Sequence, residues 1–269
     1  MPNATLNYLA RMDEKPVYYL VPPPPGTPWR NTRGDRRDLP IQDARALDPQ
    51  PSLDTLGFQL APLQTAAEDL YDAEEVHRVY YREVESLVKR VTGASRVFAF
   101  DHNVRSSEFA GRGERGAQNP VWFPHNDYTE DSSPQRVRDL LPAEEAEALL
   151  QHRFAVVNVW KPIRGPVQKD PLAICDARTI QPTHFVPTDL RYQDRIGEIY
   201  SLTFSEEHRW FYYPTMQVEE ALLLKCFDSA RDRARLTAHT AFEDDSSAPD
   251  APDRESIEVR TLAFFAANT

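Results

Sequence analysis

The clearest periodic pattern of hydrophobic and polar positions begins near Asp72 and predicts an amphipathic helix. Apolar side chains recur there at spacings of three and four residues, which places them on one helix face: Val76, Val79, Tyr80, Val84, Leu87, Val88 and Val91. Asp72 and Glu75 have the spacing of a capping box, and Gly93 stands where a helix commonly ends. The pattern therefore predicts a helix over residues 72–92.

The rest of the chain is dominated by short hydrophobic runs separated by turn residues. The run 96–101 predicts a strand, residues 103–120 a polar loop, and residues 134–152 two short helices that begin near Pro134 and Pro142. Seven strand-like runs follow without a helical pattern between them: 154–160, 171–177, 198–204, 209–214, 220–227, 235–242 and 256–265. Successive strands without crossover helices predict an antiparallel sandwich or barrel.

The chain length indicates a single domain, 1–269, with three parts. Residues 1–66 form an N-terminal arm and extension, because the tetraproline at 22–25 favours polyproline II over helix. Residues 67–152 give helical support and a loop that carries candidate metal ligands. Residues 153–269 form the main β-strand core. The predicted class is mainly β with flanking helices.

Charge and composition exclude several kinds of partner. The formal net charge of −11 argues against a nucleic acid, whose phosphates require a basic face. No apolar run approaches the roughly 20 residues of a membrane span, and the N-terminus lacks the apolar stretch of a secretory signal. Two cysteines in such a chain indicate reduced thiols and a cytoplasmic location.

One motif suggests a nucleotide and is set aside. Gly111, Gly113 and Gly116 match the spacing G-x-G-x-x-G. The dinucleotide fingerprint requires a preceding strand and a following helix, and Pro120 would interrupt that helix. We therefore expect a flexible loop here.

The candidate metal site begins with His125 and Asp127. Residues i and i+2 of an extended segment point to the same side, so this pair can offer an imidazole nitrogen and a carboxylate oxygen to one metal ion. A second histidine would complete the 2-His-1-carboxylate triad of non-haem Fe(II) oxygenases. His239 is the candidate, because Arg254 and Ser256 follow at a suitable distance; the competing histidines are His102, His184 and His208.

Arg254 and Ser256 are two residues apart on a predicted strand and so share one face. A guanidinium with a hydroxyl beside it is a good receptor for a carboxylate. A strand with the last metal ligand, followed by a strand with this pair, indicates the end of a double-stranded β-helix (a jelly-roll, cupin-like fold). Arg260 is a second candidate for the carboxylate.

Further polar and aromatic residues are candidates for the pocket. Asn158 either hydrogen-bonds a co-substrate or ties down a loop. The other candidate substrate contacts are Tyr128, Trp160, Lys161 and Arg209. Arg105, Lys161, Arg178 and Arg209 together suggest a carboxylate-bearing small molecule, and the alternative is that they are ordinary surface charges.

Seven segments together resemble the CmcJ-like oxygenases, a family that includes the gibberellin-desaturase-like enzymes: HNDYT, NVWKPI, PVQKDPLAICDART, HRWFYYP, EALLLKCFDS, LTAHTAF and RESIEVR. The resemblance covers nearly the whole chain. It implies a dioxygenase that uses Fe(II), 2-oxoglutarate and O₂ to hydroxylate, desaturate or cyclise a small molecule of secondary metabolism. It also implies that His125, Asp127 and His239 hold the metal and that Arg254 and Ser256 bind the co-substrate. The alternative is a cupin-like binding protein without oxygenase turnover.

Overall fold

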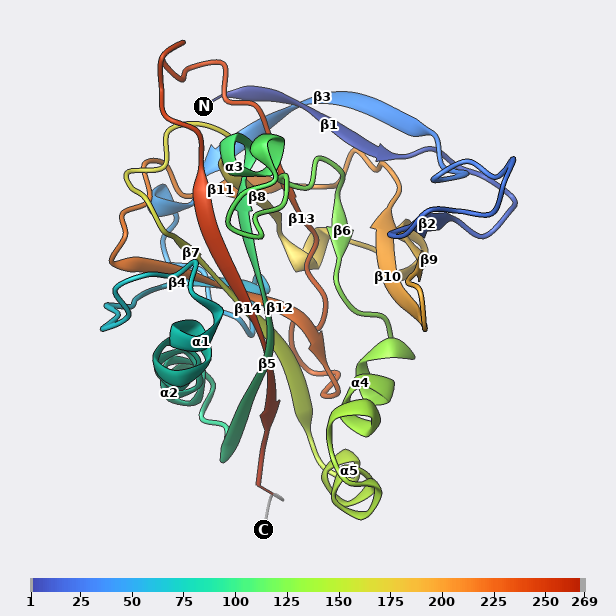
Figure 1. Cartoon of the computed structure of the whole chain (residues 1–269), viewed down its shortest axis with the longest axis vertical. Coiled ribbons are helices and arrows are strands. Elements are labelled where there is room, and N and C mark those ends of the chain that lie inside the picture. The colour runs from blue at the N-terminus through green and yellow to red at the C-terminus, as the bar shows by residue number, and fades with distance from the viewer. Residues whose placement is uncertain (1, 267–269) are drawn as a thin grey trace.

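Two facing β-sheets make up most of the molecule, as the computed structural model of residues 2–266 shows (Figure 1). The five-stranded sheet has the order β4 (Phe58–Pro62), β12 (Glu220–Asp228), β7 (Phe154–Pro162), β14 (Glu255–Phe264) and β5 (Arg96–Ser106). The nine-stranded sheet has the order β1 (Asn3–Leu9), β3 (Gly34–Asp43), β11 (Trp210–Tyr212), β8 (Leu172–Cys175), β13 (His239–Ala241), β6 (His125–Asn126), β10 (Ile196–Leu202), β9 (Phe185–Arg191) and β2 (Val17–Tyr19).

The chain crosses repeatedly between these sheets, which defines the fold. From β5 to β8 each strand lies in the sheet opposite its predecessor, and the same alternation runs from β11 to β14. The strands β5, β14, β7 and β12 thus face β6, β13, β8 and β11. This arrangement is a double-stranded β-helix, so the predicted fold class is confirmed.

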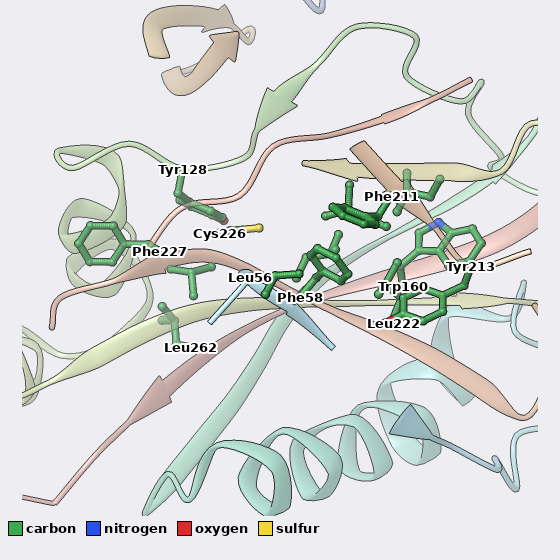
Figure 2. Close-up of a cluster of buried hydrophobic side chains, with 14 of the residues drawn as sticks. Leu56, Phe58, Tyr128, Trp160, Phe211, Tyr213, Leu222, Cys226, Phe227 and Leu262 are labelled. Atoms are coloured by element: carbon green, nitrogen blue, oxygen red, sulfur yellow. The ribbon is translucent and has the colours of Figure 1, made fainter. Parts of the chain in front are cut away.

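The two faces of the five-stranded sheet bury different clusters, because successive side chains of a strand point to opposite sides. On β7, Val156 and Trp160 face the space between the sheets, whereas Val157 and Val159 face outward. Figure 2 shows the inner cluster, in which Phe58 and Trp160 of this sheet approach Phe211 of the other.

A long helix covers the outer face of the five-stranded sheet (Figure 1). It consists of α1 (Ala73–Glu75), a π-helical turn η2 (Val76–Tyr80) and α2 (Tyr81–Thr92). The Asp72 carboxylate caps it by accepting from the backbone N–H of Glu74, at 2.9 Å. Gly93 ends it with a φ of 72°, a left-handed conformation that favours glycine. The predicted helix is thereby confirmed.

The remaining helices are short. Two lie in the zone where two were expected: α4 (Ser132–Leu140) and α5 (Ala143–Leu150). The others are α3 (Ser107–Arg112) and the 3₁₀ turns η1 (Ala44–Ala46), η3 (Ala177–Thr179) and η4 (Pro182–His184). Within residues 2–266, no helix combines the length and the apolar character that crossing a membrane requires.

Some sequence expectations differ from the structure. The predicted loop is wrong over 103–112, because β5 keeps its pairing with β14 as far as Ser106 and α3 follows at once. Gly111 lies in α3, and Gly113 is its left-handed C-cap. Strand β9 was not predicted. Residues 1–66, expected as an arm and extension, supply β1, β2, β3 and β4 to the sheets.

The contact between helix and sheet predicts the effect of a core truncation. Leu87 on α2 is fully buried in the outer cluster, which includes Val157, Val159 and Val259. Leu87→Ala should lower the free energy of unfolding by about 2–5 kcal/mol, through lost burial and the cavity that remains. Urea denaturation measures this loss. Lys89→Ala on the exposed side of α2 is the control, with an expected change within about 0.5 kcal/mol; equal losses would contradict this packing.

Candidate active site

His125, Asp127 and His239 converge between the two sheets. His125 on β6 and His239 on β13 are direct partners across neighbouring strands, and their ring centroids are 4.4 Å apart. Asp127 follows β6 and places its Oδ1 atom 3.4 Å from His125 Nε2. One potential ligand atom from each residue lies within 4.8 Å of the other two. This geometry suits one metal ion with a 2-His-1-carboxylate ligand set.

The protonation states also suit a metal. Burial and the neighbouring His125 lower the pKa of His239 to about 3, so its imidazole is neutral at physiological pH. Its Nδ1 atom is buried without a hydrogen-bond partner among the described residues. Burial alone would raise the pKa of Asp127, but the Arg260 guanidinium holds it well below its usual range. Neutral imidazoles and an ionised carboxylate are the forms that bind metals.

The facing sheet fixes the orientation of Asp127. Its Oδ2 atom accepts hydrogen bonds from Asn158 Nδ2 on β7, at 2.7 Å, and from Arg260 Nε on β14, at 2.9 Å. The Oδ1 atom is thereby directed toward the histidines. His125 is held similarly, since its Nδ1 lies 2.9 Å from the Phe123 carbonyl oxygen and leaves Nε2 facing the site.

Arg260 belongs to a buried polar network that the sequence analysis did not assign. Its Nη1 atom donates to Asp101 Oδ2 at 2.9 Å, and the Asn103 amide, with its oxygen turned toward the guanidinium, accepts from both terminal nitrogens. Glu258 lies 3.6 Å from Arg260 Nη2, and its other oxygen lies 4.0 Å from His239 Nε2. Burial and the nearby Asp127 raise the pKa of Glu258. The sequence signal for this network was the alternation of polar and apolar residues in RESIEVR. Every second residue of a strand points to the same face, so its polar residues share one side.

Arg254 and Ser256 form a second polar feature at the start of β14, where Arg254 immediately precedes the strand. Arg254 is only 3% exposed and donates through Nη1 to the Asp170 carbonyl oxygen at 2.6 Å. Its Nε atom and the Ser256 hydroxyl are buried without hydrogen-bond partners in residues 2–266. Burial and the nearby Arg105 lower the pKa of Arg254 to about 10. Unsatisfied buried donors of this kind have the chemistry of a carboxylate receptor.

Of the candidate substrate residues, two face the inter-sheet space and two do not approach the triad. Tyr128 and Trp160 lie in the inner cluster (Figure 2). Lys161 points to the opposite face of β7, because it neighbours Trp160 on a strand, and its nearby carboxylates include Glu83 of α2. Arg209 pairs with Asp176 at 3.5 Å.

The competing histidines lie elsewhere. His102 points outward from β5, where its Nδ1 lies 2.9 Å from the Tyr81 hydroxyl of α2. His184 and His208 contact each other at 3.0 Å between Nδ1 and Nε2, and His208 also lies 3.3 Å from the Tyr8 hydroxyl. Only His239 among the candidates therefore lies beside His125 and Asp127 in the part of the chain that the structure describes.

Comparisons with known proteins agree with this geometry. A family model described as an oxidoreductase/YMDC permease-like domain matches residues 6–264. The Fe(II)/2-oxoglutarate-dependent dioxygenase nvfI of Aspergillus novofumigatus is 34% identical, over 92% of this chain and 90% of its own. The chain belongs to the family of Fe(II)/2-oxoglutarate-dependent dioxygenases.

Other comparisons extend the family match. The hydroxylase/desaturase CTB9 of Cercospora beticola is 31% identical to this dioxygenase, over 94% of this chain and 89% of the relative. A solved structure of the iron and alpha-ketoglutarate-dependent endoperoxidase NvfI superposes with a TM-score of 0.89 at 29% identity, and the match covers 98% of each chain. The predicted enzyme class and its use of Fe(II), 2-oxoglutarate and O₂ are confirmed, which sets aside a binding protein without turnover.

The contact between Arg260 and Asp127 predicts a coupled effect on the stability of the metal-free dioxygenase. Arg260→Met leaves a buried carboxylate without its counter-charge, so the free energy of unfolding should fall by about 3–5 kcal/mol. Adding Asp127→Asn should recover part of this loss, because the Asp127 charge is then absent while Asp101 and Glu258 still lack the guanidinium. Urea denaturation of the single and double variants measures the coupling.

Arg96→Met is the control for that experiment, since it breaks an ion pair with Glu145 whose side chains are 45% and 38% exposed. Its expected effect is at most about 1 kcal/mol. Additive losses in the Arg260→Met/Asp127→Asn double variant would contradict the coupling.

Proposed function

We propose that His125, Asp127 and His239 hold the Fe(II) of this dioxygenase and that Arg254 and Ser256 bind the far carboxylate of 2-oxoglutarate. The observation that carries the proposal is the pairing of two incomplete sites between the same two sheets. Three potential metal ligands lie together on one side, and two unsatisfied hydrogen-bond donors lie at the start of the facing strand β14. The three ligands lack a cation, which Fe(II) would supply. The unsatisfied donors lack an anionic acceptor, which the far carboxylate of 2-oxoglutarate would supply.

The spacing along β14 supports this assignment. Ser256 and Glu258 point to the same side, one strand repeat apart, which is about 7 Å. Glu258 lies beside His239. The distance from the Arg254–Ser256 pair to the triad is therefore roughly the length of a five-carbon dicarboxylate such as 2-oxoglutarate. The co-substrate would then reach the metal with its 2-oxo acid end while its other carboxylate remains on the guanidinium.

The protein's own residues then have distinct tasks. Bound iron and 2-oxoglutarate supply the activation of O₂ that attack on an unactivated C–H bond requires. Asn158 and Arg260 keep one Asp127 oxygen occupied and the other available to the metal. In this proposal Asn158 acts on the metal ligand. The inner cluster around Trp160 excludes water from the co-substrate end of the site.

The proposed substrate is a small molecule of secondary metabolism, which the dioxygenase hydroxylates, desaturates or cyclises. Relatives named hydroxylase/desaturase support this class of reaction. Tyr128 and Trp160 are the proposed substrate contacts. The proposal does not include a carboxylate on the substrate. Arg178 and Arg209 pair with Asp176, and Lys161 faces away from the space between the sheets. Cys175 and Cys226 are buried and unpaired, which supports a cytoplasmic location.

Titration of 2-oxoglutarate into the anaerobic Fe(II) protein, followed by the visible charge-transfer band, tests the proposal. Arg254→Ala should retain the metal and weaken co-substrate binding on the order of 30- to several-thousand-fold, since one partner of a buried charge pair is lost. Arg254→Lys should recover part of this loss because it keeps the charge without the guanidinium fork. His239→Ala should lose the metal itself, measured by Mn(II) binding.

His184→Ala is the matched control and should keep both affinities. Normal metal binding in His239→Ala, with loss in His184→Ala, would mean that the third ligand is misassigned. Unchanged 2-oxoglutarate affinity in Arg254→Ala, with a large loss in Arg260→Ala, would move the carboxylate receptor to Arg260. Unchanged affinity in both variants would overturn the proposed co-substrate site.

A further inference from the structure

Arg105 on β5 lies directly across from Ser256 in the antiparallel pairing of β5 with β14. Residues paired in this way point to the same side of the sheet, with Cβ atoms about 4.5–5.5 Å apart. Ser256 and Arg254 face the space between the sheets, so Arg105 emerges beside them from the neighbouring strand. A long side chain at this position reaches both its direct partner and the diagonal position Arg254.

The guanidinium of Arg105 has few partners. Its Nη1 atom donates to the Asn119 carbonyl oxygen at 2.7 Å, which uses one of its five N–H groups. Like Arg254, it forms no ion pair with a carboxylate within 4.0 Å in residues 2–266. Two guanidiniums therefore lie near each other without a carboxylate in ion-pair contact, although the charge of Glu258 acts on both.

The electrostatics agree with this arrangement. Burial lowers the pKa of Arg105, and after burial Arg105 is the main cause of the lowered pKa of Arg254. Two like charges in one partly enclosed space repel each other, and an anion between them converts that repulsion into attraction. The unsatisfied Arg254 Nε and Ser256 hydroxyl add hydrogen-bond donors at the same place.

We propose that Arg105 is a second guanidinium of the co-substrate site, and that it binds the far carboxylate of 2-oxoglutarate together with Arg254 and Ser256. The inference rests on the proposed function and adds a binding residue to it. A carboxylate has two oxygens with four lone-pair sites, enough for two guanidiniums and a hydroxyl. The site would then select a dicarboxylic 2-oxo acid over a monocarboxylic one through donors on two strands.

A different role is also open to this side chain. Gln118 forms an isolated bridge with Arg105, and the Arg105 contact to Asn119 lies in the same segment. Arg105 would then only anchor the chain that leads from α3 to His125. The two roles differ in their dependence on the far carboxylate of the co-substrate.

The test compares 2-oxoglutarate with 2-oxopentanoate, which has the same carbon count and the same 2-oxo acid end but no far carboxylate. Each is titrated into the anaerobic Fe(II) protein for the wild type, Arg105→Met, Arg105→Lys and Arg112→Met. Arg112 is an exposed arginine of α3 paired with Glu108, and it serves as the matched control. Thermal unfolding of each metal-free variant reports any loss of anchoring.

Arg105→Met should weaken 2-oxoglutarate binding on the order of 10- to 100-fold, as expected for charge-assisted hydrogen bonds, and leave 2-oxopentanoate binding unchanged. Arg105→Lys should lie between the wild type and Arg105→Met, and Arg112→Met should match the wild type. Equal losses for both 2-oxo acids, or no loss for either, would overturn the inference.

The result for the wild type separates this inference from the proposed function. A preference for 2-oxoglutarate that Arg254→Ala abolishes and Arg105→Met does not would overturn the role of Arg105 while the proposed function stands. A wild-type Fe(II) protein that shows no charge-transfer band with 2-oxoglutarate would overturn the proposed function, and this inference with it.

Discussion

The fixed orientation of the Asp127 carboxylate is the constraint on which the site depends. Asp127 follows a strand of one sheet, yet its two hydrogen-bond donors, Asn158 and Arg260, belong to the other. Both bonds form only when the sheets face each other at the right separation and register. The apolar cluster between the sheets sets that separation, and the long helix supports the five-stranded sheet from outside. The geometry of the candidate metal site therefore depends directly on the packing of the core between the sheets.

The charges gathered at the site form a second constraint. Three arginines, Arg105, Arg254 and Arg260, face the same interior region as Asp101, Asp127 and Glu258. Formal charges cancel within this set, and a divalent metal with a dianionic co-substrate adds no net charge. Only Arg260 lies within ion-pair distance of the carboxylates, which leaves the other two guanidiniums available to an anion. Because burial of an unpaired charge is unfavourable, the lack of ion pairs at Arg105 and Arg254 favours the binding of an anionic ligand there.

The sequence predicted the features that depend on local spacing. The helix follows from its 3.6-residue apolar period, and the shared side of His125 and Asp127 follows from the two-residue period of an extended segment. The order of the strand-like runs and the position of His239 before Arg254 pointed to the fold. The proposed carboxylate receptor of RESIEVR was also visible as a pattern, although the pattern alone did not decide between Arg254 and Arg260.

What the sequence could not provide depends on contacts between strands. A β-bulge at Phe100 of β5, opposite Arg260 and Thr261, shifts the pairing of β14 with β5, and no local pattern revealed it. Arg260 meets Asp127, and Glu258 approaches His239, only after both sheets have formed. The face of Lys161 was misjudged because Trp160 and Lys161 both lie in one buried run, where hydrophobicity does not mark the inner side.

A crystal structure with Mn(II) in place of Fe(II) and with 2-oxoglutarate tests the central claim most directly. The account predicts one anomalous peak bound by His125, Asp127 and His239, with the far carboxylate of the co-substrate on Arg254 and Ser256. Asn158 and Arg260 should still donate hydrogen bonds to Asp127 Oδ2. A metal bound by other residues, or a co-substrate carboxylate seated on Arg260, would contradict the account.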